Sequence, residues 1–175
     1  DAVTGVVRDV HVETVATQYQ SAPALDSVNW RYLPESNEFL WFSQKSDWGH
    51  LYLHDLATGK EKRQLTSGDW NVAKVAHVDT ASRTLWFEGV GREAGRDPYF
   101  VHYYKVGLDG GDVQLLTPEH ANHATPPPAD GERFADVTAS ARSLPDFTNG
   151  ATENRFTSTP VIWPPTAPMT AGASP

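Results

Sequence analysis

The sequence contains no cysteine, which excludes both a disulfide-stapled fold and a zinc site built from thiolates. Long apolar runs are missing as well, because no stretch approaches the ~20 residues that a transmembrane helix needs. Positive charge is scarce: 14 lysines and arginines stand against 22 aspartates and glutamates, and the net charge is −8. Since the basic residues are also scattered singly, the sequence argues against a nucleic-acid partner.

Short apolar runs separated by turn residues dominate what is present. Four runs rich in aromatic, β-branched or leucine residues follow one another at 29–32, 39–43, 50–54 and 62–66. The segments between the later runs contain Gly49 and Gly59, which we expect to supply the positive φ of tight hairpin turns. The pattern predicts an antiparallel meander of four strands.

Copies of this pattern recur along the chain. The tripeptide LWF at 40–42 returns at 85–87, and QLT at 64–66 returns as QLLT at 114–117. The motif DxxTG at 55–59 also occurs at 1–5, which predicts that the chain begins inside an earlier repeat. Four-stranded units that recur every ~40 to 50 residues are typical of β-propellers, in which each blade packs its apolar faces on its neighbours.

The sequence therefore predicts an all-β fold: a partial β-propeller of about two to three four-stranded antiparallel blades. The propeller region covers 1–142, with blade-like units at about 28–68 and 71–117 and an incomplete unit at each end. A closed ring needs at least ~160 to 200 residues of blades, so we expect blades to be missing. The strands of the second unit are predicted at 72–78, 83–90, 99–106 and 113–116.

The two ends of the chain differ in character. Five valines give residues 6–15 the propensity of a strand, and 133–138 is a further short strand that opens a third blade. Residues 143–175 are rich in proline and poor in aliphatic side chains. This composition predicts an extended or disordered tail.

One polar insertion lengthens the second unit and is the main candidate for a binding loop. It reads GREAGRDP at 91–98, and its charged residues are Arg92, Glu93, Arg96 and Asp97. Loops carried by a rigid sheet are where recognition residues collect, so these four form a candidate substrate-gating or partner loop. The alternative is a structural contact between blades.

Other candidate groups favour simpler explanations. His50 and His54 share one face of a predicted strand, and His120 and His123 lie beside Glu119, but metal sites need three or four converging ligands. We therefore expect neither a metal nor a cofactor. Several carboxylates are expected to be solvated turn formers: Asp47, Asp55, Glu61, Asp69, Glu93 and Asp97. Five tryptophans recur with the blade and are expected to pack between blades: Trp30, Trp41, Trp48, Trp70 and Trp86.

The stretches VNWRYLPESNEFLWFSQKSDWGHLYLHDLATGKEKRQLTSGDWNV and TLWFEGVGREAGRDPYFVHYYKVGLDGGDVQLLTPE resemble the propeller domain of the dipeptidyl peptidase IV family, within the prolyl oligopeptidase clan of serine peptidases. The resemblance covers roughly residues 4–140. It implies a propeller joined to a C-terminal α/β-hydrolase domain that removes Xaa-Pro dipeptides from peptide amino termini. It also suggests a periplasmic or secreted location.

The sequence departs from that family plan in three ways. A G-x-S-x-G nucleophile elbow is absent, as is the adjacent glutamate pair that holds the substrate's amino terminus in the family, and the Pro-rich tail replaces the hydrolase after about Ala141. We therefore expect no catalytic residue and a chain that is inactive alone: a propeller fragment that gates access of peptide substrates to a hydrolase domain. The alternative is a stand-alone protein- or peptide-binding module that forms homo-oligomers through open strand edges.

Overall fold

The computed structural model describes residues 3–15, 19–20, 29–124, 135–139 and 157–160, and the described elements are almost all strands. Sheet A is antiparallel in the order β1 (Arg31–Leu33), β2 (Glu38–Ser43), β3 (His50–Asp55) and β4 (Glu61–Gln64). Sheet B repeats this order with β5 (Asn71–Asp79), β6 (Thr84–Val90), β7 (Val101–Gly107) and β8 (Gln114–Leu115). A 3-10 turn, η1 (Pro34–Ser36), joins β1 to β2.

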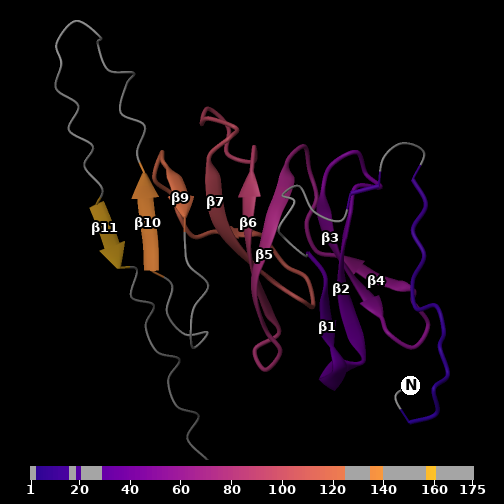
Figure 1. Cartoon of the computed structure of the whole chain (residues 1–175). Coiled ribbons are helices and arrows are strands. Elements are labelled where there is room, and N and C mark those ends of the chain that lie inside the picture. The colour runs from indigo at the N-terminus through magenta and orange to yellow at the C-terminus, as the bar shows by residue number, and fades with distance from the viewer. Residues whose placement is uncertain (1–2, 16–18, 21–28, 125–134, 140–156, 161–175) are drawn as a thin grey trace, which may run out of the picture.

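Sheet C follows sheet B, so the sheets succeed one another in chain order (Figure 1). It consists of β9 (Asn122–Ala124), β10 (Ala135–Ala139) and β11 (Thr157–Pro160), paired antiparallel in the order β9, β10, β11. The short strand predicted at 133–138 is present as β10. β11 lies within the segment for which a tail was predicted; the remainder of 143–175 is outside the described residues.

The predicted fold class is confirmed: the chain is all-β and forms part of a propeller from four-stranded antiparallel blades. All eight strands predicted for the two blade-like units are present, with ends within two residues of the expected positions. Strand identity follows from side-chain alternation, because every second residue of β2 and β6 faces the core. Among the described residues, no helix is long and apolar enough to cross a membrane.

The core lies between sheets A and B. Leu40 and Phe42 of β2 and Leu85 and Phe87 of β6 are almost completely buried there, and they are the outer residues of the two LWF copies. Each such side chain contributes about 1.5 to 3 kcal/mol through removal of apolar surface from water. The middle residue of each copy, Trp41 or Trp86, points to the opposite face of its sheet.

Trp70 joins the two sheets at the point where the chain passes from one to the other. Its ring stacks on Phe87 with centroids 6.1 Å apart and lies 5.8 Å from the ring of Tyr104. Its indole nitrogen donates to the carbonyl of Ser67 at 2.7 Å. A Cβ on Gly89 would lie 3.0 Å from both Trp70 and Tyr104, so glycine makes room for these rings.

The expected packing of tryptophans between blades holds for Trp70 but is wrong for two others. Trp30 is 50% exposed and Trp48 is 37% exposed. Trp48 lies in the turn between β2 and β3, and Trp30 directly precedes β1. The blade-like period of the tryptophans therefore reflects the repeat of the strands more than a repeat of buried positions.

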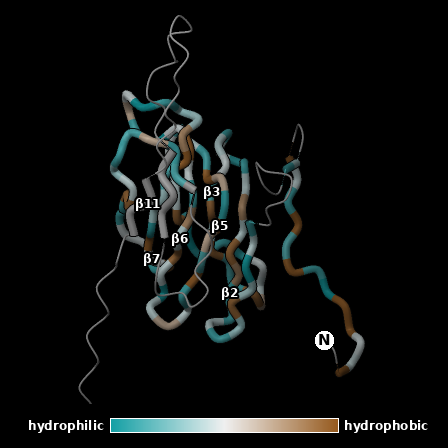
Figure 2. Tube along the Cα trace, turned by 60° about the vertical axis from the view of Figure 1, so that its left-hand side comes forward, coloured by the Kyte–Doolittle hydropathy of each residue, from teal (hydrophilic) through white to brown (hydrophobic). Residues whose placement is uncertain are grey.

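The strand predicted at 6–15 does not form. This segment lies on the face of sheet A turned away from sheet B, as Figures 1 and 2 both show. Side chains hold it there: Arg8 donates to the carbonyls of Leu56 and Ala57, and the carboxylate of Glu13 accepts from Trp41 and Ser43. A valine-rich sequence becomes a strand only when a neighbour completes its hydrogen-bond ladder, and none does so among the described residues.

The two hairpin turns differ in how they use glycine. Gly59 has φ 69°, as expected, and a Cβ there would lie 1.9 Å from the carbonyl oxygen of Val10 in the N-terminal segment. In the turn after β2, the left-handed residue is Asp47, with φ 70°, so the predicted role of Gly49 is wrong. Gly49 is needed for space instead, since a Cβ would lie 2.5 Å from the ring of Phe42.

Candidate functional site

The base of the predicted binding loop is fixed by Arg92. Its guanidinium lies 5.2 Å from the ring centroid of Tyr104 and 5.8 Å from that of Trp70, within the range of cation–π contact. Arg92 also pairs with Glu93 at 3.0 Å, and the Tyr104 hydroxyl donates to the same carboxylate at 3.1 Å. Burial, followed by the charge of Glu93, raises the pKa of Tyr104 well above its ordinary value. Arg92 and Glu93 therefore fix the base of the loop against Trp70 and Tyr104.

The rest of the loop turns away from this base. Arg96 donates to the carbonyls of Pro118 at 2.5 Å and Glu119 at 3.2 Å, which ties the loop to the segment that leads into β9. The Asp97 carboxylate accepts the backbone N–H of Tyr99 at 2.9 Å and so shapes the turn. Tyr99 is 86% exposed. The structure thus brings Arg92 and Glu93 together but places Arg96 and Asp97 elsewhere.

A polar cavity of about 370 Å³ lies beside Arg92. Sheet A contributes the end of β4 and the turn that follows it, and sheet B contributes the connection into β8. The lining residues are Gln64, Leu65, Ser67, Trp70, Arg92, Gly111, Asp112 and Val113. Because Asp112 offsets the charge of Arg92, which Glu93 already pairs, the cavity has no strong preference for anions or cations.

The predicted strand histidines do not converge. The two ring nitrogens of His50 contact the hydroxyl of Thr66 at 3.1 Å and the carbonyl of Gly68 at 2.9 Å. His54 donates from Nδ1 to the carbonyl of Gly59 at 3.1 Å and stacks on Phe39. Burial lowers the pKa of both histidines. These rings serve as packing and hydrogen-bonding groups.

The second histidine group is also dispersed. His120 packs edge-on against Phe100 with centroids 5.6 Å apart, and His123 contacts the carbonyl of Glu119 at 3.4 Å rather than its carboxylate. In the part of the chain that the structure describes, no three histidine, aspartate or glutamate side chains gather as metal ligands would.

The candidate carboxylates form hydrogen bonds or ion pairs with neighbouring residues. Asp55 accepts from both the N–H and the hydroxyl of Thr58 at 2.8 Å, and these hydrogen bonds lower the pKa of Asp55. Glu61 pairs with Lys45 at the surface. Neither carboxylate has the histidine partner or apolar pocket that acid–base chemistry calls for.

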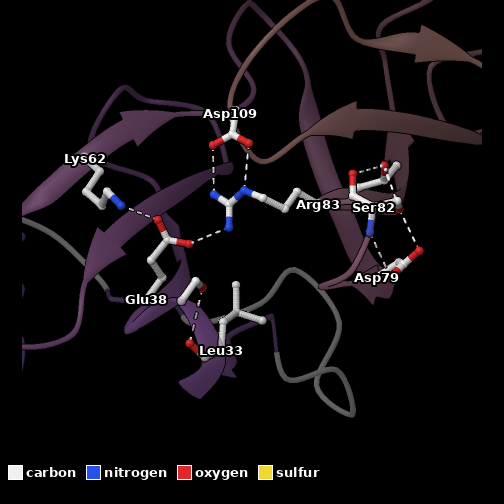
Figure 3. Close-up of polar contacts among 9 residues, drawn as sticks. Leu33, Glu38, Lys62, Asp79, Ser82, Arg83 and Asp109 are labelled. Atoms are coloured by element: carbon white, nitrogen blue, oxygen red, sulfur yellow. Dashed lines mark hydrogen bonds and ion pairs between the residues drawn. The ribbon is translucent and has the colours of Figure 1, made fainter. Parts of the chain in front are cut away.

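A charged cluster between sheets A and B escaped the sequence analysis (Figure 3). Glu38 is 1% exposed, and its carboxylate binds Lys62 of sheet A and, at 3.0 Å, Arg83 of sheet B. Arg83 also makes a two-bond contact with Asp109 at 2.7 and 2.8 Å. Burial raises the pKa of Glu38, but hydrogen bonds from Lys62 and Arg83 outweigh it and hold that pKa below its ordinary value. Hydrogen bonds to Asp109, followed by those to Glu38, raise the pKa of Arg83.

The internal sequence repeat contains the information from which this cluster could have been predicted. Glu38 and Arg83 each stand two residues before an LWF copy, so the alignment of the repeats places opposite charges at equivalent positions. Where consecutive blades pack face to face, equivalent positions lie close together. Such a pair is a candidate contact between blades.

A second unpredicted set of contacts forms the joint from sheet A to sheet B. The backbone N–H of Leu51 donates to the hydroxyl of Thr66 at 3.0 Å, beside the ring of His50. The backbone N–H of Gly49 donates to the side chain of Asn71, the first residue of β5, at 2.8 Å. Together these bonds fix where the chain leaves one sheet and enters the next.

The joint from sheet B to sheet C repeats this arrangement. The backbone N–H of Tyr103 donates to the hydroxyl of Thr117 at 2.9 Å, beside the ring of His102. The backbone N–H of Val101 donates to the side chain of Asn122, the first residue of β9, at 2.9 Å. The histidine, threonine and asparagine therefore recur at each joint, although the residues between them differ.

Comparison with known proteins agrees with this architecture. Residues 4–143 match the family described as "Dipeptidyl peptidase IV (DPP IV) N-terminal region". The chain is 35% identical over 77 residues to dipeptidyl peptidase 4 of Arthroderma otae, and 32% identical over 76 residues to dipeptidyl peptidase 4 of Trichophyton rubrum. Each alignment covers 43% of this chain and 9% of the relative, so the chain spans less than a tenth of these proteins' length.

A solved structure shows the same fold. The crystal structure of Porphyromonas gingivalis dipeptidyl peptidase 4 superimposes with a TM-score of 0.54 at 22% sequence identity, over 65% of this chain and 15% of that one. The family match extends through sheets A and B and includes both joints described above. The chain therefore belongs to the dipeptidyl peptidase IV N-terminal family.

Proposed function

We propose that this chain is the non-catalytic propeller part of a serine exopeptidase that removes Xaa-Pro dipeptides from peptide amino termini. The observation that carries the proposal is the family match over residues 4–143, together with consecutive four-stranded sheets. The sequence contains no G-x-S-x-G elbow, which supports a nucleophile that lies outside it. Its contribution is to restrict the size of the peptides that reach the nucleophile.

The loop at 91–98 with its exposed neighbour Tyr99 is the part that we propose contacts substrate or partner. Arg92 and Arg96 hold the loop on the sheets through ring and carbonyl contacts, so its base is rigid. Asp97 turns the chain and leaves Tyr99 86% exposed. A large amphipathic side chain on a fixed support is well suited to peptide recognition, because little conformational entropy is lost on contact.

The test uses the full-length protein in which this chain occurs. Hydrolysis of a Gly-Pro anilide is compared with release of the dipeptide from a long peptide that begins Gly-Pro. We expect Tyr99→Ser to change kcat/KM for the long peptide severalfold and to leave the anilide unchanged. Tyr19→Ser, at the exposed Tyr19 that precedes sheet A, is the control and should change neither. Identical selectivity in all three proteins would remove the loop from substrate recognition.

A second candidate is a stand-alone binding module that associates with itself. The observation in its favour is the exposure of Trp30 and Tyr32 at β1, 50% and 57% respectively. Large exposed aromatic side chains mark contact surfaces. Light scattering coupled to size-exclusion chromatography separates the two proposals, because a well-packed multimer that Trp30→Ser and Tyr32→Ser together dissociate would favour the binding module.

A further inference from the structure

The two joints between sheets place histidines at equivalent positions, but the rings carry their protons differently. At the first joint, Nε2 of His50 lies 2.9 Å from the carbonyl of Gly68, which only accepts, so Nε2 carries the proton. At the second joint, Nδ1 of His102 lies 3.0 Å from the carbonyl of Thr117, so Nδ1 carries it. The neutral rings are therefore opposite tautomers.

This difference leaves one nitrogen without a partner. Nε2 of His102 is buried and has no hydrogen-bond partner among the described residues, whereas both nitrogens of His50 are bonded. The His102 side chain is 2% exposed, and its ring centroid lies 5.3 Å from that of His123, which is 1% exposed. The second joint thus holds two buried imidazoles in contact.

The charged groups around His102 do little to stabilise a positive charge on its ring. Arg96, from the loop after β6, lies close enough to lower the pKa of His102, as does His123 of β9; burial is the largest cause of that lowering. Glu93, an anion close enough to raise the pKa of His102, is already engaged by Arg92 and by the hydroxyl of Tyr104.

Protonation has different consequences at the two joints. A charged His50 keeps an acceptor for each N–H, because the oxygen of Thr66 and the carbonyl of Gly68 lie in place. A charged His102 gains an N–H at Nε2 that has no acceptor in the part of the chain that the structure describes, and this N–H lies beside a second imidazole. A buried donor without a partner is costly, and so is a buried charge.

We propose that the His102–His123 pair is a proton-sensitive joint: when His102 takes up a proton, the connection between sheet B and β9 opens while the connection between sheets A and B holds. Opening exposes the Nε2 proton to water and separates the two rings. Protonation of His102 alone causes the opening, so no ligand, metal or second chain is required.

The direction of the pH dependence follows from linkage. The pKa of His102 in the closed joint is below its ordinary value of 6.5, so the open form binds a proton more readily than the closed form. The closed joint is therefore fully stable above pH 6.5. Below it, the opening constant rises by up to about tenfold per pH unit as His102 takes up a proton on opening, until the pKa of the closed form is reached.

Hydrogen exchange on the full chain tests this, with rates divided by the intrinsic rate at each pH. The reporter is the amide of Tyr103, bonded to Thr117, and the matched reference is the amide of Leu51, bonded to Thr66. The pKa of His50 is lowered as well, so the protection of Leu51 should also fall below pH 6.5, but between pH 7.5 and 5.5 we expect the protection of Tyr103 to fall severalfold further, up to about tenfold. A parallel fall of both amides would overturn the proposal, since it would report unfolding of the whole chain.

Two variants assign the effect to one ring. His102→Asn keeps an amide near Nδ1 that can donate to Thr117 and removes the titrating group, so the extra loss at Tyr103 should disappear. His50→Gln, the matched change at the first joint, should leave that loss unchanged. Persistence of the loss in His102→Asn would refute the assignment. If His102→Asn does not fold, the change of the imidazole nitrogen chemical shifts with pH in the unmodified chain provides the test. The proposal requires the midpoint of the His102 titration and the midpoint of the loss of protection at Tyr103 to agree within about one pH unit.

Discussion

Replacement of Arg83 by methionine should destabilise the chain, because it removes a positive charge of sheet B that binds Glu38 of sheet A. Arg83 reaches Glu38 at 3.0 Å, and the Glu38 side chain is only 2% exposed. Methionine keeps much of the length and apolar stem of arginine. The loss is therefore that of the ion pair across the interface and of the two bonds to Asp109, whose side chain is 69% exposed, with little change in packing.

The magnitude follows from the partners that remain. Loss of one partner from a buried ion pair costs about 3 to 5 kcal/mol when the other charge is left alone. Lys62 still binds Glu38 in the variant, so we expect a cost of about 2 to 3 kcal/mol for Arg83→Met. Lys62→Met should cost about 1 kcal/mol or less, because the Lys62 side chain is 46% exposed and Arg83 remains.

The assay is thermal or urea unfolding of the chain followed by tryptophan fluorescence. For a chain of this length, 2 to 3 kcal/mol corresponds to a fall in Tm of roughly 4 to 12 °C. Adding Glu38→Gln to Arg83→Met should restore about 1 kcal/mol, because the poorly compensated charge is then gone. Equal costs for Arg83→Met and Lys62→Met, or no recovery in the double variant, would refute the argument.

Three further predictions concern pH, one glycine and the central aromatic ring. Since the pKa of Glu38 is held below its ordinary value near 4.5, stability should be intact above that pH and fall as pH drops through the lowered value; a pH-independent Tm between 5 and 3 would contradict this. Gly59→Ala should release the N-terminal segment, because the new Cβ would lie 1.9 Å from the carbonyl oxygen of Val10, and trypsin should then cleave after Arg8. Gly95→Ala, with a similar φ of 76° and no atom within 4 Å, is the control and should leave that site protected. Trp70→Ala should cost about 3 to 5 kcal/mol and abolish much of the near-ultraviolet circular dichroism, whereas an unchanged aromatic spectrum would remove this ring from the core.

Alternation and repeats were enough to predict the strands of both blade-like units. The LWF copies succeed because their outer residues are buried and the sheets repeat the same pairing, so Leu40 faces Leu53 just as Leu85 faces Val106. Local composition failed at 6–15, where valines favour a strand but side chains such as Arg8 provide the attachment. It failed again at Gly49, because a glycine can be required for space as well as for φ.

The contacts between sheets were beyond local patterns. Glu38 reads as an ordinary polar residue at the start of a strand until Arg83 is placed opposite it. The contact of His102 with His123 depends on how the chain crosses from sheet B to sheet C, which spacing does not determine. The loop residues Arg92 and Arg96 were selected as charged residues of a polar insertion, yet in the structure both anchor the loop; their proposed role in recognition stays a prediction.

Peptidase activity of the purified chain, beside that of the full-length protein in which it occurs, is the most direct test of the central claim. The substrate is a chromogenic Gly-Pro amide, with and without a serine-directed inhibitor. A non-catalytic propeller part predicts turnover by the full-length protein and none by the chain of 175 residues. Turnover by the chain alone that the inhibitor blocks would contradict the account, because it would require a nucleophile within this sequence.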